Sequence, residues 1–289
     1  MTAQAEAAPL VIERPGVYDD IPAEVYHADP VPGGSLSSSG AKKLLPPSCP
    51  ARFRYEQDHP QPPTEPMEIG TAAHKLVLGV GPELVKIDAK DWRTKAAKEA
   101  AAEARERGAV PLLAADYAHV HGMAAALYRD DTARTLLNPD YGRPEQAIFW
   151  IDLETDVWRR ALIDWLPTEG RDGPVVVDYK TTTSADLDSI RKTVHRYGYH
   201  QQAPWYLDAV ESIGYPDDTR FQFIFQERTP PYVITVVELD DAALRIGNAR
   251  NRRAIEVYRD CAEAGVWPGH ATDIETISLP AWAEREEYA

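Results

Sequence analysis

The sequence predicts an α/β fold in which helices flank one central mixed β-sheet. The first observation is that apolar residues recur at helical spacing through much of the first half of the chain. The second is a change near residue 140, after which short runs rich in Ile, Val, Trp and Phe are separated by turn residues, as strands are. Helical patterns then return between and after the later strands. Helices first, then a strand meander, then helix, strand and helix is the order expected around such a sheet.

The first half is predicted to be helical. Serines at 35–39 precede Ala41–Leu45 and cap a short helix that ends at Pro46. From Glu68 to Leu78 small and apolar residues keep helical spacing, and Gly79 ends the run. A polar helix over 95–108 and one longer amphipathic helix over 112–137 follow. Residues 1–15 are expected to be a disordered tail.

The second half is predicted to alternate between strands and helices. The expected strands are 145–152, 157–166, 175–179, 221–226 and 232–239, and the expected helices are 186–195, 197–213 and 240–264. We expect a single domain over 16–289, made of a helical N-terminal part (16–140), a core (141–265) and a C-terminal tail (266–289).

Composition excludes some classes of protein. The chain of 289 residues has only two cysteines, Cys49 and Cys261, which argues against a disulfide scaffold or a zinc site and favours a reducing cytoplasm. No run of 18 uncharged apolar residues occurs, so we expect no membrane span. The net charge of −15 does not exclude DNA, because binding needs only a local basic surface. Basic clusters that could form one lie at 42–54, 159–160, 191–196 and 250–253.

Two aspartates interrupt strands that are otherwise apolar. Asp164 follows Ala-Leu-Ile, and Asp178 follows three valines and precedes Lys180 by two residues. A buried carboxylate must be paired, hydrogen-bonded or metal-bound, because burying it bare is too costly. Alternation along a strand places Asp178 and Lys180 on one face. Oxygen ligands beside an ammonium group suit metal-assisted phosphodiester hydrolysis, with Mg²⁺ or Mn²⁺ as the metal.

These residues resemble the D…(D/E)xK signature of the restriction-endonuclease-like, or PD-(D/E)XK, nuclease superfamily. Gln202-Ala-Pro-Trp-Tyr206 resembles the QxxxY motif of its RecB-like branch, since positions i and i+4 share a helix face. Gly70-Thr-Ala-Ala-His74 resembles the GxxxH element of that branch. Within the branch the chain is most similar to the RecE-type (exonuclease VIII) nuclease domains and their phage relatives.

The resemblance implies a role for each site residue and a restriction-endonuclease-like core. His74, Asp164, Asp178 and the backbone carbonyl of Tyr179 would bind Mg²⁺, and Lys180 would position or activate the attacking water. Gln202 and Tyr206 would support the lysine or contact phosphate. No iron–sulfur cluster is expected, because two cysteines are too few to hold one.

The resemblance also implies an activity and partners. It suggests a double-strand DNA exonuclease that degrades 5′-ended strands and leaves 3′ overhangs for phage-type recombination in a bacterial cytoplasm. Relatives form ring-shaped homo-oligomers, such as tetramers, and work beside a RecT-like single-strand annealing protein. In such a ring, the channel would be lined by the expected DNA-contact residues, which are Arg191, Lys192, Arg196 and His200.

Other interpretations stay open from the sequence. The chain could be a catalytically silent DNA-end-binding or assembly protein with this fold, an AddB-like nuclease, or a hydrolase of another phosphate ester. Cys49 lies in a Pro-Ser-Cys-Pro context that resembles the first cluster ligand of AddB-type nucleases. Glu145 could be an accessory carboxylate, although solvation of an edge strand is the simpler interpretation. His74 and Tyr206 could each be ordinary helix residues.

Overall fold

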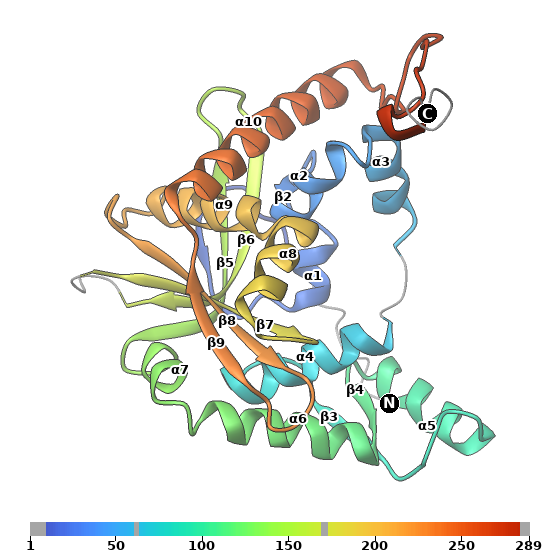
Figure 1. The fold of residues 1–289 in the computed structure, drawn as a ribbon, viewed down its shortest axis with the longest axis vertical. Coiled ribbons are helices and arrows are strands. Elements are labelled where there is room, and N and C mark those ends of the chain that lie inside the picture. The colour runs from blue at the N-terminus through green and yellow to red at the C-terminus, as the bar shows by residue number, and fades with distance from the viewer. Residues whose placement is uncertain (1–9, 61–63, 169–172, 284–289) are drawn as a thin grey trace, which may run out of the picture.

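A mixed β-sheet lies at the centre of the computed structural model, which describes residues 10–60, 64–168 and 173–283 (Figure 1). The main sheet has the strand order β1-β5-β6-β7-β8-β9, and the short strand β2 pairs with β6. The pairs β7–β8 and β2–β6 are parallel and the others are antiparallel. The predicted mixed sheet flanked by helices is therefore confirmed.

Although the described first half was predicted to be helical and also contains four short strands, the second half follows the predicted order of elements. The elements are β1 (Gly16–Tyr18), α1 (Ala23–His27), β2 (Leu36–Ser37), α2 (Ser38–Leu44), α3 (Pro50–Asp58), α4 (Glu65–Leu78), β3 (Leu84–Ile87), α5 (Lys95–Glu106), β4 (Val110–Leu113), α6 (Ala114–Leu127), α7 (Asp131–Leu136), β5 (Gly142–Ile151), β6 (Trp158–Pro167), β7 (Val175–Thr182), α8 (Leu187–Tyr197), α9 (Tyr199–Glu211), β8 (Arg220–Glu227), β9 (Ile234–Glu238) and α10 (Asp241–Ala264).

Local sequence sets several of these boundaries. The side chains of Ser37 and Asp186 accept hydrogen bonds from backbone amides in the first turns of α2 and α8 and so cap both helices. Gly79 ends α4 in the left-handed conformation. The single helix predicted over 112–137 was wrong: this stretch contains the end of β4 and two helices, α6 and α7, and the side chain of Asp130 caps the second.

Helices lie on both faces of the sheet (Figure 1), and an apolar layer packs between the sheet and the helices on each face. On one face, residues of α2, α9 and α10 pack with Ile148, Phe223 and Phe225. On the other face, residues of α4, α6 and α7 pack with Tyr179 and Ile224. Burial of these side chains drives assembly of both layers. Helices on opposite faces, α4 and α9, can therefore both reach β6 and β7 from the two sides.

Strands β6 and β7 share a single bridged pair, Trp165 with Val177. Continuing this antiparallel register by one residue places Asp164 opposite Asp178, beyond the point where the strands stay paired. There the backbone amide of Tyr179 donates to Oδ2 of Asp164 at 2.9 Å. The carboxylate of Asp164 thus hydrogen-bonds to the backbone of β7 at the point where the backbone pairing of β6 with β7 ends.

Helices α9 and α10 touch through their backbones. Pro204, inside α9, has no N–H to donate to the carbonyl of His200 four residues earlier. Gly247 of α10 packs onto that carbonyl so closely that an added Cβ would lie 1.5 Å from the oxygen. Asn251, one turn on, donates to the neighbouring carbonyl of Gln201 at 2.8 Å. Pro204 therefore frees the carbonyl of His200 from its helix hydrogen bond, and Gly247 allows α10 to pack directly onto that carbonyl.

Several residues of the predicted basic clusters are structural instead. Arg159 is 4% exposed, stacks between Trp150 and Trp205, and pairs with Asp208 at 2.8 Å. Arg160 is 3% exposed and bonds to Asp29 and to Ser35 ahead of β2. Each arginine sits on β6 among anionic or carbonyl partners, so neither is available to a DNA surface.

The described parts of the two expected terminal tails can be compared with the prediction. Residues 1–9 of the expected N-terminal tail and 284–289 of the expected C-terminal tail lie outside the described residues. Within the described part, Ile12 is fully buried and its amide bonds to Pro30, so ordered packing begins before residue 16. Among the described helices, none has both the length and the apolar character that a membrane span needs.

Candidate metal centre

Three side chains from three elements meet beside the parted strands. His74 of α4, Glu145 of β5 and Asp164 of β6 each offer a ligand atom, and these atoms lie within 4.8 Å of one another. Nδ1 of His74 is 3.6 Å from Oδ2 of Asp164. The ring of His74 also packs edge-on against Tyr179, with centroids 5.2 Å apart. The sequence predicted His74 and Asp164 as metal ligands, and the fold brings them together.

Asp178 lies next to this group but has different neighbours. It is fully buried, and its Oδ1 accepts a hydrogen bond from Nε2 of Gln202 at 2.6 Å. Its Oδ2 is 2.6 Å from Nζ of Lys180, which is on the same face of β7. The i, i+4 partner of Gln202, Tyr206, contacts Gln202 and packs against Phe221. Helix α9 thus positions the carboxylate of Asp178 through the hydrogen bond from Gln202.

Tyr179 has a structural environment on the opposite face of β7. Its amide bonds to Asp164, and its hydroxyl donates to Gln226 at 2.6 Å inside the α4–α6 layer. Whether its carbonyl binds metal stays a prediction. The hydrogen bond from its amide fixes the position of the Tyr179 backbone relative to the carboxylate of Asp164.

Burial shapes the electrostatics of the group. Burial and the nearby Asp164 raise the pKa of Asp178 to about 6, and burial also raises the pKa of Asp164. Burial and Lys180 lower the pKa of His74 to about 4, so its imidazole is neutral and able to bind a cation near neutral pH. Burial acts to lower the pKa of Lys180, but Asp178 and Asp164 outweigh it and raise that pKa above its usual value.

The donor set fits a hard divalent cation. One neutral imidazole and the carboxyl groups of Glu145 and Asp164 converge, and Asp178 lies next to them with Lys180 as its cation. The buried Oδ2 of Asp178 accepts no hydrogen bond from the described residues and has only its ion pair with Lys180. Burial raises the pKa of both Asp164 and Asp178, which makes their ionised forms costly, and a bound Mg²⁺ or Mn²⁺ would offset that cost.

Comparison with known proteins agrees with this geometry. Residues 37–280 match the family described as PDDEXK-like domain of unknown function (DUF3799). The chain belongs to this family. The match spans α2 to the segment after α10 and includes every residue of the metal centre. No curated protein sequence matches the chain.

Solved structures resemble this PDDEXK-like domain in fold. A candidate exonuclease from Eubacterium rectale is 13% identical, with a TM-score of 0.58, over 86% of this chain and 92% of its own. An alkaline exonuclease from Laribacter hongkongensis is 12% identical, with a TM-score of 0.31, over 80% of this chain and 92% of its own. The first shows the shared fold.

Glu145 is the residue of this PDDEXK-like site that the sequence placed wrongly. It is half-buried on β5, which lies between β1 and β6, so it is not a solvated edge residue. The β5–β6 register places it opposite Asp164, and its φ of 51° is a strained value for a non-glycine residue. A signal did exist: if the predicted strands 145–152 and 157–166 pair as neighbours, residue 152 lies opposite 157 and Glu145 therefore opposite Asp164.

Replacing Glu145 with glutamine should stabilise the metal-free protein at alkaline pH. Burial and then Asp164 raise the pKa of Glu145 from 4.5 to about 7. Because the folded pKa lies above the unfolded one, stability conferred by the protonated form is lost as pH rises through about 4.5 to 7. Glu145→Gln removes this loss, a gain on the order of 1 kcal/mol.

Melting temperatures in EDTA at pH 8 and pH 4 measure the effect. The variant should melt higher than the wild type at pH 8 and about equally at pH 4. Glu103→Gln, on the exposed face of α5, is the control and should change neither value. A wild type at least as stable as Glu145→Gln at pH 8 would contradict the burial argument.

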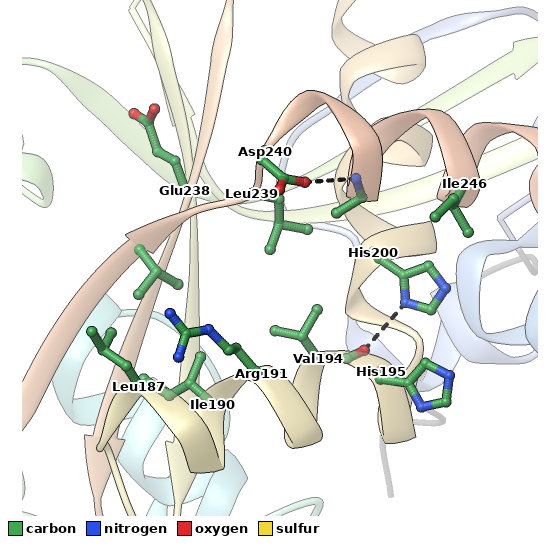
Figure 2. A pocket seen from close by; sticks show the side chains of 12 residues that line it. Leu187, Ile190, Arg191, Val194, His195, His200, Glu238, Leu239, Asp240 and Ile246 are labelled. Carbon is green, nitrogen blue, oxygen red and sulfur yellow. Dashed lines mark hydrogen bonds between the residues drawn. The ribbon is translucent and has the colours of Figure 1, made fainter.

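Within the described residues, none of the four predicted DNA-contact residues forms a hydrogen bond, ion pair or ring contact with the residues of this centre. Arg191 and His200 line a groove between α8, β9 and α10, shown in Figure 2, with His195 and Glu238. His200 bonds to the carbonyl of Val194 at 3.3 Å, and Arg191 pairs with Asp188 at 2.6 Å. Lys192 and Arg196 are exposed on α8. The structure does not bring these four residues together with the metal centre, and their role in DNA binding stays a prediction.

Proposed function

We propose that this PDDEXK-like domain is a divalent-metal-dependent nuclease that acts on DNA. The observation that carries the proposal is the opposition of Asp164 and Asp178 where β6 and β7 part, with Lys180 paired to Asp178 at 2.6 Å. Buried like charges at such a point are costly unless a cation binds between them. A protein without metal chemistry would gain nothing from this arrangement.

The residues of the centre would divide into metal ligands, a cation at the reacting phosphate, and residues that position the ligands. Asp164, Asp178, His74 and the newly placed Glu145 would hold the metal, with the Tyr179 carbonyl as a further ligand. When bound, the metal lowers the pKa of a coordinated water and offsets negative charge on the phosphate. Lys180 keeps its proton because its pKa is raised, so it would act as a cation that orients the nucleophile or stabilises phosphate charge, and not as a base. Gln202 orients Asp178, and Tyr206 supports Gln202.

The finer form of the proposal is an exonuclease on linear duplex DNA. The fold shared with the Eubacterium rectale protein, itself described as a candidate exonuclease, supports it. We further propose Mg²⁺ as the metal, 5′-to-3′ polarity with 3′ overhangs as product, a ring-shaped homo-oligomer, and a RecT-like annealing partner in the bacterial cytoplasm. These features come from the resemblance of the motifs to the RecE-type branch.

One degradation assay tests the proposal. Purified protein is incubated with linear duplex, covalently closed circular duplex and linear single strands, each with Mg²⁺ or with EDTA. We expect release of nucleotides from linear duplex only, and only with Mg²⁺. Separate labels on the 5′ and 3′ ends report polarity. Binding of linear ends without degradation in Mg²⁺ would instead favour a silent end-binding protein, and cleavage of the circle would favour an endonuclease.

A further inference from the structure

Lys42 is a second lysine at the metal centre that none of the motifs includes. It lies on α2, and its side chain crosses Gly198 at the α8–α9 junction, where an added Cβ would lie 3.1 Å from its Cδ. Its Nζ lies over the ring of Tyr199, 5.5 Å from the centroid. The stem is thus held in one direction by packing, unlike that of a solvated surface lysine.

The same tyrosine ring also faces the lysine of the DxK motif. Nζ of Lys180 is 5.0 Å from the centroid of Tyr199, so two ammonium groups converge on one aromatic side chain. Burial and then Lys180 lower the pKa of Lys42 to about 7. Bringing two cations together in this way is unfavourable in the absence of an anion.

Lys42 has no anionic partner of its own in the described part of the chain, because Asp178, the carboxylate that acts on its pKa, is already paired with Lys180. Lys180 has Asp178 as its partner, whereas Lys42 forms no ion pair or hydrogen bond with any described residue. Its neighbour Lys43, by contrast, pairs with Glu56 at 2.6 Å on the exposed side of α2. An oriented, unpaired cation that is half-buried beside a catalytic centre is a site for an external anion.

We infer that Lys42 binds a backbone phosphate of the nucleic acid next to the scissile phosphate, with Tyr199 as the platform that aligns Lys42 and Lys180. The inference rests on the proposed nuclease function, because that function supplies a polyanion whose neighbouring phosphates follow the strand. A carboxylate would satisfy one lysine, but a run of phosphates satisfies both Lys42 and the metal centre at once. Lys42 is then a substrate-binding residue and Lys180 remains the residue at the reacting group.

A purely structural role makes different predictions. If the contact with Tyr199 only fastened α2 to α9, removing the charge would lower stability and leave DNA binding unchanged in its salt dependence. Lys42→Met keeps the unbranched stem over Gly198 and removes the charge. Lys43→Met is the matched control on the adjacent residue of the same helix. Lys42→Arg restores a cation.

The experiment combines three measurements on these variants and the wild type. Anisotropy of a fluorescein-labelled linear duplex is followed in EDTA between about 50 and 200 mM salt. Lys42→Met should bind about tenfold more weakly, and its log–log salt slope should be shallower by about one unit. Steady-state cleavage in Mg²⁺ should show the loss chiefly in KM. Lys43→Met should match the wild type, Lys42→Arg should recover part of the affinity, and all melting temperatures should agree.

The outcomes separate the two proposals. If the wild type degrades duplex but Lys42→Met equals Lys43→Met in affinity and salt slope, Lys42 is not a phosphate ligand and the nuclease function stands. If the wild type binds duplex without degrading it, the nuclease function fails while the binding data still decide the role of Lys42. If the wild type neither binds nor degrades duplex, both proposals are overturned.

Discussion

Replacing Asp178 with asparagine should abolish cleavage of linear duplex while leaving the fold intact. The oxygen of asparagine can still accept the hydrogen bond from Gln202, so the packing behind β7 is kept. The negative charge that would bind the metal is lost, and the new amide meets the ammonium group of Lys180 as a second donor. We expect a decrease in rate on the order of 10³-fold or more.

Rates of nucleotide release in Mg²⁺, with circular dichroism as the check on folding, measure this effect. Asp188→Asn, an exposed aspartate on α8 paired only with Arg191, is the matched control and should cleave like the wild type. A melting-temperature increase on adding Mg²⁺ should be seen in the wild type and reduced in Asp178→Asn. Normal digestion by a folded Asp178→Asn protein would place the chemistry elsewhere.

Lys180→Met should cause a loss of similar size for a different reason. The variant keeps a long apolar side chain against Tyr199 but removes the cation beside Asp178. Metal binding should survive and even tighten, because the positive charge that competes for the buried carboxylates is gone. The rate at saturating Mg²⁺ should fall on the order of 10²- to 10³-fold, since a preorganised cation no longer acts on the reacting phosphate.

A magnesium titration separates this variant from the aspartate variant. Lys180→Met should show an unchanged or lower half-saturating Mg²⁺ concentration together with a much lower maximal rate. Lys98→Met, an exposed lysine on α5, controls for general loss of positive charge. A Lys180→Met protein that needs far more Mg²⁺ but regains the full rate would assign the lysine to metal-site architecture instead.

Much of the centre could be predicted because short-range geometry determines it. Strand alternation places Asp178 and Lys180 on one face, and helical spacing places Gln202 and Tyr206 on one face. The order of elements placed Asp164 and Asp178 on neighbouring strands. The structure adds the pairwise contacts, such as the hydrogen bond between Gln202 and Asp178, and their assignment as a working site stays a prediction.

The residues whose place in the structure the sequence left open or misjudged depend on long-range geometry. Glu145 lies at the centre because of the β5–β6 register. A shift of that register by one residue would turn its side chain to the other face of the sheet. Lys42 belongs to a serine-capped helix that is far from the motifs in sequence, and only the packing of α2 on α9 brings them together. Likewise, nothing local to Arg159 and Arg160 shows that their partners are Asp208 and Asp29.

The contact between Gly247 and the carbonyl of His200 limits how the protein can move. With no side chain between them, α9 and α10 cannot slide past each other by small rotamer adjustments, as helices separated by longer side chains can. We therefore expect the two helices to shift together. Since Gln202 is in the first turns of α9, any force applied to the long helix α10 would be transmitted to the carboxylate of Asp178. The fold thereby connects the surface of α10, through α9 and Gln202, to Asp178 on β7.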